Sequence, residues 1–110
     1  MYNIKNLVER LNSKVFFVKG GSDYVAMDAK TKKHFTGIYR QFYETGSLKS
    51  KSYFSLGIHH GIYLAYYRNG QLKERAWFRI GWPTGMFISF FENGKLRSRG
   101  FTIFCETKFC

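Results

Sequence analysis

A 24-residue repeat constrains this chain more than any other feature of its sequence. Written from residue 38, the blocks 38–61, 62–85 and 86–110 align without a gap, and the last block is one residue longer. Identical residues recur at two positions of all three blocks: Gly46, Gly70 and Gly94, and Leu48, Leu72 and Leu96. A fixed period of this length is typical of repeat architectures, in which neighbouring units stack to bury a shared core.

Each block predicts a β-hairpin. A segment of aromatic and aliphatic residues runs into Thr45-Gly46, Asn69-Gly70 or Asn93-Gly94, and a second strand follows. Asn-Gly is a strong hairpin signal, and it predicts a two-residue type I′ turn with positive φ at both central residues. Because one hairpin is marginally stable in water, we expect the units to stack into one open sheet. The predicted fold class is therefore mainly β, built from stacked hairpin repeats.

The first 37 residues differ from the repeats. Apolar residues at spacings of three and four predict a short amphipathic α-helix over residues 3–13. Residues 15–18 and 24–27 then predict two short strands, which we interpret as a degenerate leading hairpin. We expect the helix to cap the open end of the array, as terminal units of repeat proteins do. At 110 residues, the leading region (1–37) and the repeats (38–110) predict one compact domain.

The repeat unit resembles a known family. The segment from Gly61 to Lys73 follows the pattern Gly-x-x-x-x-Tyr-Tyr-x-Asn-Gly-x-Leu-Lys, and Phe35-Thr36-Gly37 precedes the first full unit. Both features resemble the MORN-repeat variant of bacterial antitoxin-like proteins, over residues 34–104. The resemblance implies stacked hairpins that serve as a binding scaffold. It also implies an antitoxin or immunity-type inhibitor, which would neutralise a cognate toxin or effector by steric occlusion in a stoichiometric complex.

Alternation of side chains along the strands assigns two faces to the predicted sheet. One face places large residues opposite small ones, and we expect it to form the core. The expected pairs on this face are Tyr67/Leu72, Ala65/Glu74, Tyr63/Ala76, Tyr43/Leu48, Tyr39/Ser52, Phe91/Leu96 and Phe87/Gly100.

The opposite face carries cations at two equivalent positions of every repeat, together with aromatic residues. The candidate partner-binding residues are Phe42, Lys49, Lys51, Tyr66, Lys73, Arg75, Trp77, Phe90, Arg97 and Arg99. Two other interpretations stay open from the sequence alone. The cations are also compatible with an ordinary solvated surface, and the N-terminal helix is long enough to cover the apolar part of this face.

The charge of the chain favours an acidic partner. Eighteen Lys and Arg residues against seven Asp and Glu residues give a formal net charge of +11. An acidic protein, the toxin or effector of the first hypothesis, is the expected partner. Nucleic acid and an anionic membrane are the alternatives, because cations beside aromatic residues also suit phosphates and bases. A small-molecule substrate is not expected, and the C-terminal edge of the sheet is a candidate homodimer contact.

No motif predicts catalysis or a cofactor. His59 and His60 are adjacent and point apart on an extended chain, so we interpret them as turn residues rather than metal ligands. Cys105 and Cys110 have no activating partner in the pattern. We therefore expect no enzyme activity, metal or cofactor. The chain has no apolar run of spanning length and no secretory signal at its N-terminus, which predicts a cytoplasmic protein.

Overall fold

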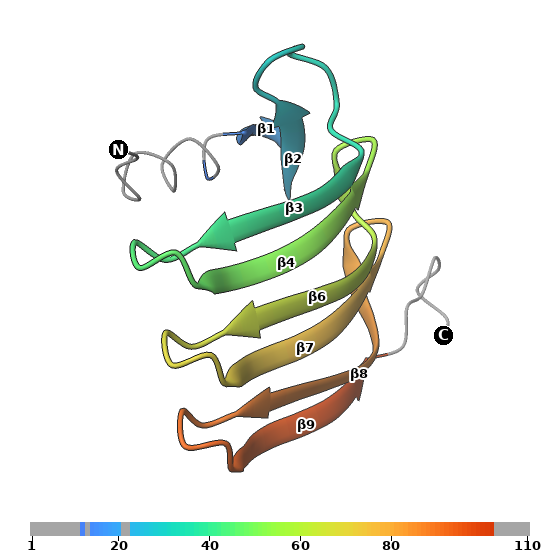
Figure 1. The fold of residues 1–110 in the computed structure, drawn as a ribbon. Coiled ribbons are helices and arrows are strands. Elements are labelled where there is room, and N and C mark those ends of the chain that lie inside the picture. The colour runs from blue at the N-terminus through green and yellow to red at the C-terminus, as the bar shows by residue number, and fades with distance from the viewer. Residues whose placement is uncertain (1–11, 13, 21–22, 103–110) are drawn as a thin grey trace, which may run out of the picture.

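The computed structural model describes residues 12, 14–20 and 23–102 and consists mainly of antiparallel strands (Figure 1). The strands are β1 (Val15–Gly20), β2 (Asp23–Asp28), β3 (Gly37–Phe42), β4 (Leu48–Ser55), β5 (Ile58–His59), β6 (Gly61–Tyr66), β7 (Leu72–Arg79), β8 (Trp82–Phe90) and β9 (Leu96–Thr102). The predicted mainly-β class is confirmed. The helix predicted over residues 3–13 lies outside the described residues except for Asn12, and so do Cys105 and Cys110.

The repeats form one antiparallel sheet in the order β3-β4-β6-β7-β8-β9, with the short β5 paired to β4. Figure 1 shows three stacked hairpins, β3–β4, β6–β7 and β8–β9, whose tight turns all lie along one side of the sheet. The links between hairpins lie along the opposite side. Each predicted repeat therefore supplies one hairpin, as the 24-residue period indicated.

The leading hairpin does not extend this sheet. β1 and β2 form a separate two-stranded sheet, which backbone hydrogen bonds tie to the first link. The amide of Ala26 donates to the Gly57 carbonyl (2.8 Å), and the amide of Gly57 donates to the Phe35 carbonyl (2.7 Å). The buried core of this end consists of Val15, Ala26, Phe35, Tyr39 and Phe54. The hairpin thus covers one face of the first repeat instead of adding a strand to its edge.

The Asn-Gly turns differ from the predicted type I′ turn. In each hairpin the glycine amide donates to the carbonyl three residues before it, as Gly70 does to Tyr67 at 3.0 Å. Only the glycine has a positive φ, 88° at Gly70, while Asn69 does not. This geometry is a type I turn followed by a left-handed glycine, the usual three-residue hairpin connection. The Asn69 side chain stabilises it by accepting a hydrogen bond from the Gln71 amide (2.9 Å).

This turn shifts the strand register by one residue. Tyr66 pairs with Leu72, and Ala65 pairs with Glu74, so that Lys73 is an extra residue in a β-bulge. The same bulge occurs in the other two hairpins, at Lys49 and Arg97. The predicted pairs Tyr67/Leu72, Tyr43/Leu48 and Phe91/Leu96 are therefore wrong, because the leucine pairs with the preceding aromatic residue.

Beyond the bulges the predicted core pairs are confirmed. Those pairs are Tyr39/Ser52, Ala65/Glu74, Tyr63/Ala76 and Phe87/Gly100. Burial on this face decreases along the array: Tyr39 is 6% exposed, whereas Phe87 is 36% exposed. The β1–β2 hairpin lies over the first repeat, where the Phe17 ring lies 5.9 Å from the rings of both Tyr39 and Phe54. The face is a core at the N-terminal end and is partly open in the third hairpin.

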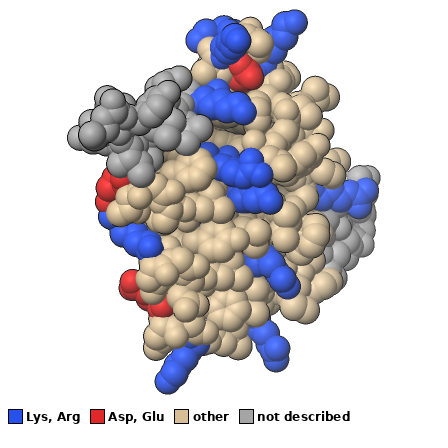
Figure 2. Space-filling model, viewed as in Figure 1, with Lys and Arg blue, Asp and Glu red and all other residues tan. Residues whose placement is uncertain are grey.

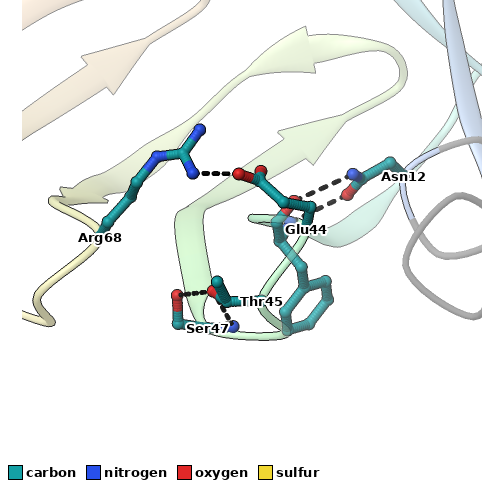
Figure 3. A network of polar contacts seen from close by, with 6 residues as sticks. Asn12, Glu44, Thr45, Ser47 and Arg68 are labelled. Carbon is teal, nitrogen blue, oxygen red and sulfur yellow. Dashed lines mark hydrogen bonds and ion pairs between the residues drawn. The ribbon is translucent and has the colours of Figure 1, made fainter. Parts of the chain in front are cut away.

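Side chains beside the turns tie each hairpin to the next. The Tyr43 hydroxyl donates to the Tyr66 carbonyl (2.6 Å), and the repeat-equivalent Tyr67 hydroxyl donates to the Phe90 carbonyl (2.8 Å). Arg68 forms an ion pair with Glu44 of the preceding turn (Figure 3). Asn12 bonds the backbone of Phe42 with both its side-chain oxygen and nitrogen, at the open edge of β3 (Figure 3).

Candidate partner-binding face

A row of basic and aliphatic side chains crosses the whole sheet on one face. The register of five strand pairs places each member directly opposite the next, and we call these residues the basic row: Arg40, Lys51, Leu64, Arg75, Ile88 and Arg99. Figure 2 shows Lys and Arg side chains at intervals down this face, from the first hairpin to the last, with uncharged surface between them. One residue from each strand builds the row, so its continuity depends on the pairing between hairpins.

Two apolar rows flank the basic row. The link-side row lies two residues away along each strand and comprises the cross-strand pairs Ile38/Tyr53, Ile62/Trp77 and Met86/Phe101. The turn-side row comprises the pairs Phe42/Leu48, Tyr66/Leu72 and Phe90/Leu96. The link-side row is the more exposed of the two, with Trp77 46% and Phe101 69% accessible. Exposed aromatic residues beside cations are typical of interaction surfaces.

The structure separates the two sets of predicted cations. Lys51, Arg75 and Arg99 lie in the basic row, one in each hairpin. Lys49, Lys73 and Arg97 occupy the bulges. Two of them contact rings of their own hairpin: the Lys49 ammonium lies 5.8 Å from the Tyr43 ring, and the Lys73 ammonium lies 5.7 Å from the Tyr67 ring. Strict alternation along the sequence placed both sets of cations on one face, because it took no account of the bulge.

The predicted aromatic residues also divide between the rows. Phe42, Tyr66 and Phe90 belong to the half-buried turn-side row, whereas Trp77 belongs to the link-side row. The candidate set omitted Tyr53 and Phe101, which occupy the position of Trp77 in the other two hairpins and are 38% and 69% exposed. The repeat alignment contained this signal, since the three aromatic residues are 24 residues apart. The set also omitted Arg40, which completes the basic row.

No carboxylate neutralises this face within the described chain. Two acidic residues, Glu44 and Glu92, follow β3 and β8 in the hairpin turns. Glu44 pairs with Arg68, and its own backbone amide together with Arg68 holds the pKa of that carboxyl below its ordinary value. Glu74 lies on the opposite face, directly across from Ala65. Among the described residues, no carboxylate therefore forms an ion pair with a cation of the basic row.

Among the described residues, the other side chains considered for chemistry have structural roles. The His59 ring lies between the rings of Phe54 (4.3 Å) and Phe78 (4.8 Å), so it continues the aromatic packing of the core face. A shallow pocket of about 230 Å³ beside it has an open mouth and is lined by Ser55, Ile58, His59, His60 and Ile80. Within residues 12, 14–20 and 23–102, no three His, Cys, Asp or Glu residues form a group that could hold a metal ion. The same residues include no helix long and apolar enough to cross a bilayer.

Stacked hairpins with an extended, repeated surface define the class of this protein: it is a hairpin-repeat binding scaffold. The model of the MORN repeat variant family matches residues 35–55, 60–76 and 83–103, one match for each hairpin and more than half of the chain. The chain therefore belongs to the MORN repeat variant family. No curated protein and no solved structure gives a significant match.

Proposed function

We propose that this protein is a non-catalytic, cytoplasmic binding module whose basic row and flanking apolar rows hold an acidic protein partner. The observation that carries the proposal is the basic row itself. Four cations lie in one line across six strands, and the described residues of that face contain no acid. An acidic partner surface would complement this charge, and such complementarity mainly raises the association rate. The exposed side chains of Trp77 and Phe101 would supply apolar anchors.

The finer proposal is that the complex is inhibitory. The repeat unit resembles the variant found in bacterial antitoxin-like proteins, and an extended sheet face is suited to covering an effector surface. In this proposal a one-to-one complex blocks the toxin or effector by steric occlusion. Co-expression with the captured partner should then relieve any growth defect that the partner causes, and variants of the basic row should not.

Affinity capture from the source lysate tests the face, with nuclease treatment and mass spectrometry. Lys51→Glu/Arg75→Glu should lose the partner. Lys49→Glu/Lys73→Glu should retain it, although both double variants change the net charge by the same amount. Equal loss from both variants would indicate a general charge effect and would contradict the assignment of this face. A complex that survives nuclease and has a one-to-one mass by light scattering would support the proposal.

A nucleic-acid partner is the second candidate, because a cation and an exposed aromatic ring repeat together on the same strand in each hairpin. Lys51 and Tyr53, Arg75 and Trp77, and Arg99 and Phe101 are the three couples. Phosphate contacts combined with base stacking use these two side-chain types. Nucleic acid recovered alone and released by moderate salt would replace the first proposal by this one. Recovery with acidic vesicles would instead favour an anionic membrane.

A further inference from the structure

The spacing of charge along the basic row restricts the shape of the partner. Lys51, Arg75 and Arg99 occupy equivalent positions in successive hairpins, two strands apart. Because adjacent strands lie about 4.8 Å apart, these three cations recur about every 9.6 Å in a line perpendicular to the strands. Leu64 and Ile88 fill the intervening positions. A matching partner presents acidic groups at nearly this interval.

The width of the face restricts the partner further. Residues two apart on a strand are about 6.7 Å apart, so the link-side row, the basic row and the turn-side row together span about 13 Å. The cross-section of the face is therefore apolar, basic and apolar. An α-helix with its side chains is about 10–12 Å across, which is nearly the width of the three rows.

Among regular peptide structures, the α-helix matches the charge interval best. Residues seven apart in a helix are separated by about 10.5 Å and lie within about 20° of one face. An extended strand offers same-face residues at about 6.7 Å or 13.4 Å, and neither interval fits. The mismatch of about 1 Å per helical repeat is small compared with the reach of Lys and Arg side chains.

We infer that the partner contributes an amphipathic α-helix, which lies across the strands on this face. The helix carries Asp or Glu at positions i, i+7 and i+14, facing Lys51, Arg75 and Arg99. Apolar residues at i+3 and i+4 lie on either side of this acidic stripe and contact the two apolar rows. The inference rests on the proposed function, since it specifies the segment that an acidic protein partner would offer.

Fluorescein-labelled 22-residue peptides test the inference by anisotropy with the full-length protein. The first peptide carries three glutamates, each seven residues from the next, with leucine at the flanking i+3 and i+4 positions. The second has the same composition with its glutamates five residues apart, so that the charges spiral around the helix. The first should bind at least 10-fold more tightly, and Arg75→Glu should remove that advantage. Replacing the central glutamate of the peptide by arginine should restore binding to Arg75→Glu, whereas Lys73→Glu should change affinity less than 3-fold.

The outcomes separate this inference from the proposed function. If both acidic peptides bind equally and both are lost with Arg75→Glu, the helix is wrong and the acidic partner stands. If neither peptide binds and oligo(dT) binds with steep salt dependence, both proposals are overturned. If the first peptide is preferred but the charge exchange restores nothing, the pairing along the basic row is wrong. Circular dichroism and thermal unfolding of each variant identify any loss of fold.

Discussion

Arg40 and Lys51 lie directly opposite each other on β3 and β4, on the same face of the sheet. Like charges at directly opposite positions destabilise a sheet. No described carboxylate pairs with either residue. A cost to stability at this position is what we expect where a surface is adapted to a partner rather than to the fold.

The first prediction follows from this pair. Arg40→Glu places an acid opposite Lys51 and replaces repulsion by attraction, so we expect it to raise the free energy of unfolding by about 0.2–1 kcal/mol. The same change should weaken partner binding. Thermal unfolding and affinity capture measure the two effects, and Lys95→Glu in the third turn is the control with an equal change of charge. A loss of stability in Arg40→Glu would contradict the repulsion.

The tyrosine bonds between hairpins give the second prediction. Tyr43→Phe and Tyr67→Phe each remove a hydroxyl that bonds the next hairpin's backbone, and each should cost about 0.5–1.5 kcal/mol of unfolding free energy. The third repeat has Phe91 at this position, 50% exposed, and the described chain has no following hairpin there. Phe91→Tyr should therefore leave stability unchanged. Denaturant unfolding compares the three variants, and equal effects at all positions would refute the assigned role.

Gly57 gives the third prediction, because it connects the leading hairpin to the sheet. Its φ is 84°, and a Cβ there would lie 2.4 Å from the Val25 side chain and 2.8 Å from the Ala26 carbonyl. The repeat-equivalent Gly81 has a similar φ of 80°, but the nearest atom to a Cβ there is the Ile58 Cγ2 atom, at the longer distance of 3.2 Å. We expect Gly57→Ala to cost about 3 kcal/mol or more and Gly81→Ala about 1 kcal/mol. Similar losses in chemical denaturation would show that the close approach at Gly57 contributes nothing.

The fourth prediction concerns two strained link residues. Leu56 and Ile80 have φ values of 49° and 50°, and both side chains are exposed. Each precedes a glycine of positive φ in a two-residue connection, the geometry that Asn-Gly favours. Leu56→Asn and Ile80→Asn should each stabilise the fold by about 1 kcal/mol, with the larger gain at the β-branched Ile80. Trp82→Asn, at the first residue of β8, is the control and should bring no gain in melting temperature.

The fifth prediction concerns the turn after β2. The Asp28 carboxylate accepts hydrogen bonds from the backbone amides of Thr31 (2.9 Å) and Lys30 (2.8 Å), which hold its pKa below the ordinary value. A lowered folded-state pKa stabilises the fold above the unfolded pKa of about 3.9, and this stabilisation is lost as pH falls through the folded pKa. Asp28→Asn should therefore lower the melting temperature at pH 7 and differ less from the parent below pH 3.9, about the unfolded pKa. A difference independent of pH would refute the role of the charge.

Local sequence signals predict most of the repeat. The period, the glycines and the alternation locate three hairpins, and the predicted pairs far from the turns, such as Phe87 with Gly100, are confirmed. They are confirmed because the extra residue of each bulge cancels the one-residue shift that the longer turn introduces. A Cβ at Gly100 would lie 2.3 Å from the Phe87 ring, so the alternation of large and small residues reports real packing.

The hairpins, the mainly-β class and the charge of the molecule can thus be read from the chain alone, since they depend on composition and on residues close together in sequence. The bulges, the basic row and the position of the leading hairpin required the three-dimensional arrangement. A bulge at Lys73 follows from how a type I turn fits two twisted strands. The basic row exists because Lys51 pairs with Leu64 and Arg75 with Ile88 across separate hairpins. That register is set by strained links and shared packing, which no local pattern records.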